Sequence, residues 1–412
     1  MRIQEIHKRG FVLLLTLVIM LTLSTIAGAL IFALSSDFRA AAIQSNDGKA
    51  FWLAEAGIAD AIKRLKNNEI VLADGNTDNS SIQNVNLGDG QYSVTLSRAG
   101  QEVTITSVGT VEGQTRTLSQ IETVGLGFPA AFDYAVFGAN GSNTSLTIAG
   151  TGALNVTITG DFFYDRPSLS DAMVVQANSG ISGLTYTDSI SGSGTYTLET
   201  GDPDPVPTYA VFDKTSYDNA ITVADSVPRS DFTLSGSSTL NLAGGTQYYH
   251  NFIADNTSIV NGPGTIVVTG LAAIVSNATI GNNVKIISKT SITVRNQAKV
   301  NTGSVLYSRI QSVLMESAIV NASLISPEAA SAPNVTIRDS AKLTGIIYAE
   351  RINILNDAII NGSLVVNRFH GDQISGTGIK INYSQNYIPT QVPEGFQTRE
   401  IYSKKANSWK EM

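Results

Sequence analysis

The chain has 412 residues, a formal net charge of −7, only 15% charged residues and no cysteine. The lack of cysteine excludes disulfide bonds, thiolate metal sites and thiol catalysis, and an acidic balance without a basic patch argues against a nucleic-acid partner. The length allows two or three domains. A composition rich in Gly, Ser, Thr and Asn is typical of a β-rich secreted protein rather than of a helical enzyme.

A short charged leader, residues 1–10, is followed by residues 11–34, which contain no charged side chain. As a helix, this run would extend roughly 36 Å, enough to cross a bilayer core of about 30 Å. Lys8 and Arg9 directly precede the run, so the positive-inside bias predicts a cytoplasmic leader and an outward-facing remainder. A secretory signal peptide cleaved at residues 27–29 is the alternative, although its apolar region would be shorter.

The helix is expected to continue through residues 35–68, because apolar residues recur there at helical spacing with polar residues between them. This part is predicted to be amphipathic and exposed to water. Its apolar stripe is the predicted assembly face of the helix and consists of Phe51, Ala54, Ile58, Ile62 and Leu65.

The leader, the apolar span and the run FWLAEAGI at residues 51–58 together resemble the start of a type IV pilin-like protein, specifically of the PilX-like minor pilins. The resemblance covers about the first 65 residues. It implies that a prepilin peptidase cuts between Gly10 and Phe11 and methylates the new N-terminus. Most major pilins carry a glutamate at the fifth mature position, where this chain has Leu15, and this departure favours a minor or accessory pilin.

Residues 69–127 are expected to form a small antiparallel sheet. Three segments show period-two alternation and are separated by Gly-containing turns; they are residues 92–97, 103–111 and 115–124. Packed against the apolar stripe, this sheet would give the helix-plus-sheet unit that the resemblance implies. The polar stretch before it, residues 74–90, is interpreted as a solvated turn. A calcium loop there is the alternative, but it would need a glutamate where Val85 stands.

Residues 128–385 are predicted to form a parallel β-solenoid. An alanine followed two residues later by an aliphatic residue recurs about every 20 residues, and three short strand signals accompany each recurrence, as in one solenoid rung. The marker alanines are Ala278, Ala298, Ala318, Ala341 and Ala358. Asn301, Asn321 and Asn361, with Thr344 in the equivalent place, are predicted to form left-handed corners.

Three parts of the predicted solenoid region are less regular. Residues 146–158 and 240–268, upstream of the regular repeat, are interpreted as earlier, less regular rungs. Four prolines predict an excursion from the wall at residues 199–230, where Asp202 and Asp204 could hold a cation or simply form an exposed turn. The tail, residues 386–412, is predicted to be a short terminal helix or a cap.

No catalytic, cofactor-binding or metal-binding residue is predicted. Parallel β-helices include polysaccharide lyases and pectin-type hydrolases, so the fold alone permits carbohydrate chemistry. Such hydrolases need carboxylates on adjacent rungs of one face, and the acidic residues of the regular repeat do not recur at one position; they are Glu316, Glu328, Asp339, Glu350 and Asp357. His250 and His370 show no metal-ligand spacing, and no nucleophile elbow is present.

The sequence therefore predicts an α+β chain with a long transmembrane and amphipathic helix, a small antiparallel sheet and a parallel β-solenoid. The leading hypothesis is a pilin-like structural subunit, a minor pilin or pilus-assembly component, that displays its solenoid for surface adhesion or filament-tip interactions. The expected partners are prepilin peptidase, other pilins, the bacterial inner membrane and surface glycans. The subunit would lie in that membrane before assembly and outside the cell afterwards. The alternatives are a membrane-tethered carbohydrate-active enzyme and a surface adhesin that enters no filament.

Overall fold

The structure is a computed structural model that describes residues 3–67, 69–138, 145–151, 155–164, 172–187, 189–199, 209–328, 333–369, 371, 373–405 and 408–411, with side chains of the first helix from residue 14 onward. The chain divides into two compact units. The first contains residues 1–126 and 400–412, and the second contains residues 127–399. The predicted class is confirmed: one long apolar N-terminal helix, a small antiparallel sheet and a parallel β-solenoid.

The first unit packs one helix on one sheet. Helix α1 (Ile3–Lys66) is continuous through the leader, the apolar run and the amphipathic part. The sheet order is β1-β2-β3-β4-β31, and β32 also pairs with β4. The strands are β1 (Thr77–Leu87), β2 (Gly90–Ala99), β3 (Glu102–Val111), β4 (Gln114–Gly127), β31 (Arg399–Lys404) and β32 (Lys410–Glu411).

Two expectations about this sheet are wrong. The polar stretch predicted as a turn forms β1, an edge strand whose register shifts twice against β2. An edge strand tolerates polar residues because one of its sides faces water, and Asp78 accepts hydrogen bonds from the backbone N–H groups of Ser80 and Ser81. The tail ends neither in a helix nor in a cap, because its last residues add β31 and β32 to this same sheet.

The second unit is built of stacked rungs of three strands. β16 (Phe252–Ala254), β17 (Ile259–Asn261) and β18 (Gly264–Val268) pair in parallel with β19 (Leu271–Ile274), β20 (Thr279–Ile280) and β21 (Val284–Ser288) of the next rung. The other strands in this part are β13 (Phe232–Leu234), β14 (Thr239–Asn241), β15 (Thr246–Tyr249), β22 (Ser291–Val294), β23 (Lys299–Ser308), β24 (Gln311–Leu314), β25 (Ile319–Ser326), β26 (Val335–Ile337), β27 (Lys342–Ile354), β28 (Ile359–Phe369), β29 (Gln373–Gly376) and β30 (Lys380–Asn382). Their inward aliphatic side chains form one continuous core.

The corners of the rungs differ from the prediction. Asn301, Asn321 and Asn361 lie inside strands. The left-handed residues are instead the two that precede each marker alanine, as at Ser276 (φ 52) and Asn277 (φ 66). Two consecutive residues with positive φ change the direction of the chain sharply within few residues. The corners of successive rungs are also hydrogen-bonded to each other: the backbone N–H of Asn277 donates to the carbonyl of Asn296 over 3.0 Å.

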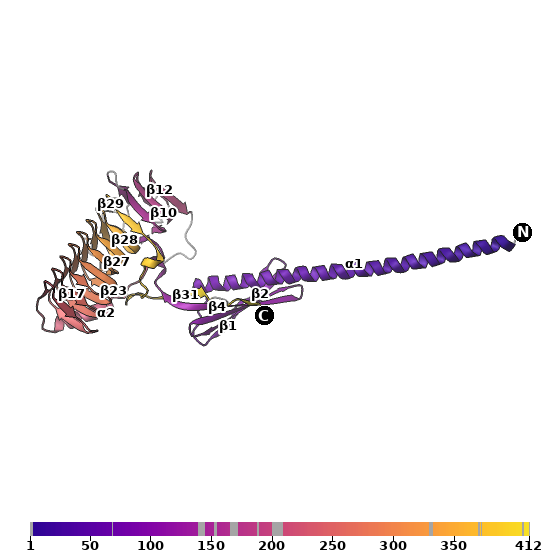
Figure 1. Cartoon of the computed structure of the whole chain (residues 1–412), viewed down its shortest axis with the longest axis horizontal. Helices are drawn as coiled ribbons and strands as arrows, with labels where there is room; N and C mark the ends of the chain where they lie inside the picture. The colour runs from indigo at the N-terminus through magenta and orange to yellow at the C-terminus, as the bar shows by residue number, and fades with distance from the viewer. Residues whose placement is uncertain are drawn as a thin grey trace. The chain divides into compact units, whose positions relative to one another are not determined.

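The stacking order also differs from the chain order. The first strands of this unit, β5 (Val136–Gly138), β6 (Leu146–Gly150) and β7 (Val156–Thr159), pair with its last strands, β28, β29 and β30. Figure 1 shows β10 and β12 beside β28 and β29, at the opposite end of the stack from β17. Residues 146–158 therefore belong to rungs, as predicted, but they stack on the last strands of the regular repeat rather than on its first ones. The remaining elements at this end are β8 (Phe162–Tyr164), β9 (Met173–Val175), β10 (Ser179–Tyr186), β11 (Ile190–Ser191) and β12 (Thr195–Glu199).

The predicted excursion contains helix α2 (Thr215–Ser226), which packs on the outside of the solenoid. Its buried residues Tyr217, Ile221 and Ala224 follow helical spacing and belong to a second cluster with the outward side chains of β18, β21 and β23, which are Val267, Ile287 and Tyr307. Asp202 and Asp204 lie outside the described residues. The described part of this unit also contains the 3-10 helices Ala130–Asp133 and Gln385–Tyr387.

Replacing Gly362 with alanine is expected to lower the free energy of unfolding by at least about 3 kcal/mol. Gly362 has φ +140, and a Cβ there would lie 1.7 Å from the Gly345 carbonyl oxygen of the paired strand. The matched control is Gly236→Ala, where φ is +64 and no atom lies within 4 Å of the added Cβ, so only about 1 kcal/mol of backbone strain is expected. Urea unfolding followed by circular dichroism measures both, and equal losses would contradict the proposed clash between rungs.

Candidate functional site

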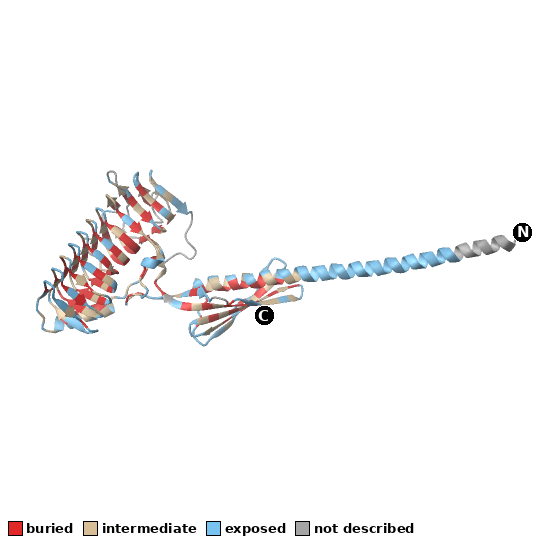
Figure 2. Cartoon of the chain, in the orientation of Figure 1, coloured by how far each residue is buried: buried red, intermediate tan, exposed pale blue. Residues whose placement is uncertain are grey.

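The most exposed apolar surface of the first unit is the helix between Leu14 and Ile43. Its large apolar side chains point in all directions around the axis, and Figure 2 shows this part of α1 as exposed throughout. Phe32 is 76% exposed and Leu23 is 61% exposed. The helix contains an 18-residue stretch with a mean hydropathy of 2.5, so by length and composition alone it could cross a membrane. An apolar surface of this size requires a cover of lipid or of other helices.

The predicted processing site lies at the start of the same helix. Gly10 and Phe11 both have helical backbone within α1. The side chains of Lys8, Arg9 and Phe11 lie outside the described residues. Cleavage between Gly10 and Phe11 therefore stays a prediction.

The predicted assembly stripe packs against the sheet of its own unit. Ala54, Ile58 and Leu65 are buried, and Phe51 and Ile62 are partly buried against the same core. Small residues allow this close approach, because a Cβ at Gly109 of β3 would lie 2.1 Å from a helix carbonyl oxygen. The stripe thus joins helix to sheet, and an additional role in contacts with other subunits stays a prediction.

Polar contacts also join the same helix to the strands of the sheet. Arg116 of β4 donates hydrogen bonds to both carboxylate oxygens of Asp47, over 2.6 and 2.5 Å, and to Glu411 over 2.6 Å. The hydrogen bond from Arg116 lowers the pKa of Asp47 from its ordinary value of 3.8. Tyr92 of β2 donates to Asp60 over 3.1 Å. The helix is therefore held by charge as well as by packing.

One outer wall of the solenoid is already covered by its own chain. Tyr217 of α2 stacks on Tyr307 with ring centroids 4.3 Å apart, and Phe212 and Phe396 pack beside them on Tyr348. Burial raises the pKa of the Tyr217 and Tyr307 hydroxyls above the usual range. These tyrosines are packing groups and are not available to an external ligand.

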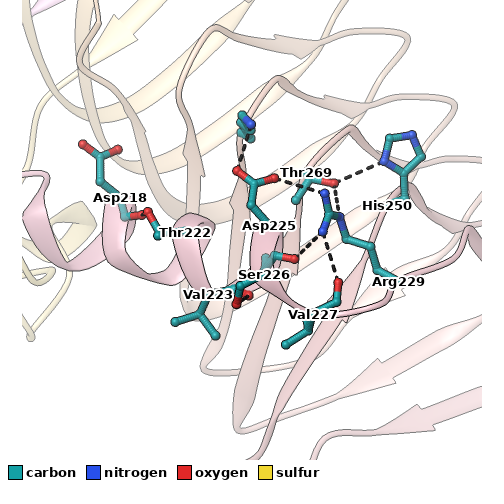
Figure 3. Close-up of polar contacts among 11 residues, drawn as sticks. Asp218, Thr222, Val223, Asp225, Ser226, Val227, Arg229, His250 and Thr269 are labelled. Carbon is teal, nitrogen blue, oxygen red and sulfur yellow. Dashed lines mark hydrogen bonds and ion pairs between the residues drawn. The ribbon is translucent and has the colours of Figure 1, made fainter.

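Arg229 fastens the end of α2 to this wall, as Figure 3 shows. It donates to the C-terminal carbonyls of Ala224 and Val227, over 2.5 and 3.2 Å, and to Thr269 over 2.7 Å. The C-terminus of a helix carries partial negative charge, so the guanidinium of Arg229 also stabilises the end of α2 electrostatically. His250, predicted as a loop histidine without a metal partner, lies with Nδ1 3.2 Å from the Thr269 hydroxyl.

A groove of about 720 Å³, lined by both polar and apolar side chains, lies between the rungs and the segment that follows β30. Its rung side includes Asn282, Thr302, Asn321 and Thr344, and its other side includes Tyr387. The charged lining residues, Lys285 and Glu394, pair with each other over 2.8 Å. The rest of the lining is neutral. Such a groove offers hydrogen-bond donors and acceptors without a net charge.

The carboxylates of the regular repeat are dispersed. Glu328 pairs with Lys214 and Arg309, Glu350 accepts from Asn367, and Glu316, Asp339 and Asp357 lie in the corner turns. Across the described part of the chain, no group of three or more His, Asp or Glu residues could hold a metal ion. His370 lies outside the described residues.

Glu328 is expected to give the second unit a stability term that depends on pH. Burial alone raises its pKa, but the hydrogen bonds from Lys214 and Arg309 outweigh burial and lower the pKa below 4.5. This stabilisation is present above pH 4.5 and is lost as pH falls through the lower folded-state pKa. Glu328→Gln should therefore cost about 1 kcal/mol at pH 7 and less at pH 3, as measured by urea unfolding at both values. An equal cost at both pH values would contradict the ion-pair role.

The sequence matches no family model and no curated protein. Among solved structures, the chain is similar to the competence-associated pilin ComZ from Thermus thermophilus, with 11% identity over 89% of this chain and 98% of that chain and a TM-score of 0.26. At this identity and TM-score, the likeness does not establish a shared fold.

Proposed function

We propose that the chain is a pilin-like structural subunit, a minor pilin or pilus-assembly component, that carries a β-solenoid outside the cell. One observation supports this above all: α1 is a single helix whose first part is apolar and exposed and whose second part is packed on an antiparallel sheet. The first part would lie in the inner membrane before assembly and among the helices of other pilins afterwards.

The two units have different roles in this proposal. The helix and sheet would hold the subunit in a filament, and the solenoid would contact surfaces, surface glycans or other minor pilins. A catalytic role is not part of this proposal. Glu328 and Glu350 are engaged with neighbouring side chains rather than grouped along one wall, and hydrolysis of glycans would need paired free carboxylates.

The leader supplies the sharpest test. We expect a prepilin peptidase to cut after Gly10, so the mature chain in its native host should begin at Phe11 and carry an N-terminal methyl group. Gly10→Val should leave the leader attached, because a peptidase that recognises glycine at this position has no room for the larger side chain. Mass spectrometry of the N-terminal peptide measures both.

The matched control is Gly28→Val, in the same helix, where nothing lies within 4 Å of an added Cβ. This variant should still begin at Phe11. A wild-type chain that begins at Met1 would exclude processing by the pilin route. A wild-type chain that begins near Ala29 would show that residues 1–28 are a secretory signal peptide.

A further inference from the structure

We propose that one outer wall of the solenoid binds a linear acidic polysaccharide with a carboxylate on every second sugar. This inference deepens the proposed function, since it names the class of surface ligand that an exported solenoid would contact. The wall consists of the outward side chains of β17, β20, β30 and the first residues of β23, β25, β27 and β28. It is a different wall from the one covered by α2.

A row of lysines runs along this wall. The parallel register places Lys299, Ile319, Lys342, Ile359 and Lys380 next to one another on five successive rungs. The three lysines are exposed. Among the described residues, none of the three has an ion pair or a hydrogen bond from its side chain, whereas Lys214, Lys285 and Lys289 of the same unit are all paired. Three unpaired positive charges therefore lie on one line.

The spacing of the row suits a repeating anion. Neighbouring strands of a sheet lie about 4.8 Å apart, so lysines on alternate rungs recur roughly every 9–10 Å. In a polysaccharide that alternates uronic acid and neutral sugar, carboxylates recur once per disaccharide, a comparable length. In duplex DNA each strand carries a phosphate about every 3.4 Å of helix axis, so a duplex does not match the row charge for charge. Ile319, which is 37% exposed, and Ile359 would contact the apolar faces of the sugar rings between carboxylates.

A second row provides hydrogen bonds beside the lysines. Thr344, Asn361 and Asn382 are in register two residues further along their strands, and Asn301 and Asn321 stand at the same offset from Lys299 and Ile319. Asn361 is buried, whereas the other four are partly exposed and can reach a ligand. Asn382 donates to Asn361 over 3.0 Å, which fixes the orientation of both amides. Amide and hydroxyl groups are suited to sugar hydroxyls because each can donate or accept.

The groove between the rungs and the segment after β30 adjoins this surface. Asn321 and Thr344 belong to both the second row and the groove lining. Tyr387, at the far side of the groove, is 37% exposed and offers a ring face to a sugar. A chain lying on the lysine row would thus place its neutral hydroxyls toward a lining without net charge.

The test uses the full chain in lipid nanodiscs and biolayer interferometry against three immobilised probes: hyaluronan, dextran of similar length, and single-stranded poly-deoxythymidine. We expect hyaluronan to bind, with an affinity that falls as salt rises, and dextran to bind much more weakly. The triple variant K299Q/K342Q/K380Q should weaken hyaluronan binding about tenfold, as expected for three exposed ion pairs of ordinary strength.

The matched control K66Q/K404Q/K410Q removes the same net charge from exposed lysines of the first unit and should change the affinity by less than about twofold, within the range of screened long-range effects. Circular dichroism confirms that both variants are folded. The proposal is overturned if hyaluronan does not bind, if both triple variants weaken it equally, or if poly-deoxythymidine binds more tightly than hyaluronan. The binding assay does not depend on leader cleavage. Absence of hyaluronan binding would therefore not contradict the pilin-like function, and absence of cleavage after Gly10 would not contradict polysaccharide binding.

Discussion

The second unit depends on backbone hydrogen bonds between successive rungs. A single rung of three short strands encloses almost no apolar volume and leaves its N–H and C=O groups unpaired, so it has no stability alone. Stacking satisfies these groups and aligns the inward aliphatic residues into one core. Because no cysteine is present, this ladder and its core replace the disulfides that many secreted proteins use.

The same ladder places outward side chains in straight rows, and the rows of different walls have different uses. On one wall the row is aromatic and aliphatic, and α2 with the segment around Phe396 covers it. On another wall the row alternates lysine and isoleucine and lies exposed. A strand register that repeats on every rung therefore turns a short sequence pattern into an extended surface, which is what recognition of a long polymer requires.

Sequence reasoning predicted the elements of this fold better than their arrangement. Charge-free residues 11–34 and the alanine period identify the helix and the rungs because both signals are local. The pairing of β5 with β28 is not predictable from the period, since rungs of similar pattern fit one another in several orders. The asparagine row was mistaken for corners because asparagine suits both left-handed turns and exposed strand positions. The lysine row was missed because its members lie about 40 residues apart and only the register aligns them.

The central claim is that the apolar first part of α1 is buried in lipid or among other helices while the solenoid lies outside the cytoplasm. The cysteine-free chain allows a direct measurement, because a single introduced cysteine is the sole thiol. In intact cells, a membrane-impermeant maleimide should label Asn353→Cys on the solenoid surface and should not label Ile31→Cys in the helix, while both react after denaturation in detergent. Labelling of Ile31→Cys in intact cells, or protection of Asn353→Cys until the cells are lysed, would contradict the account.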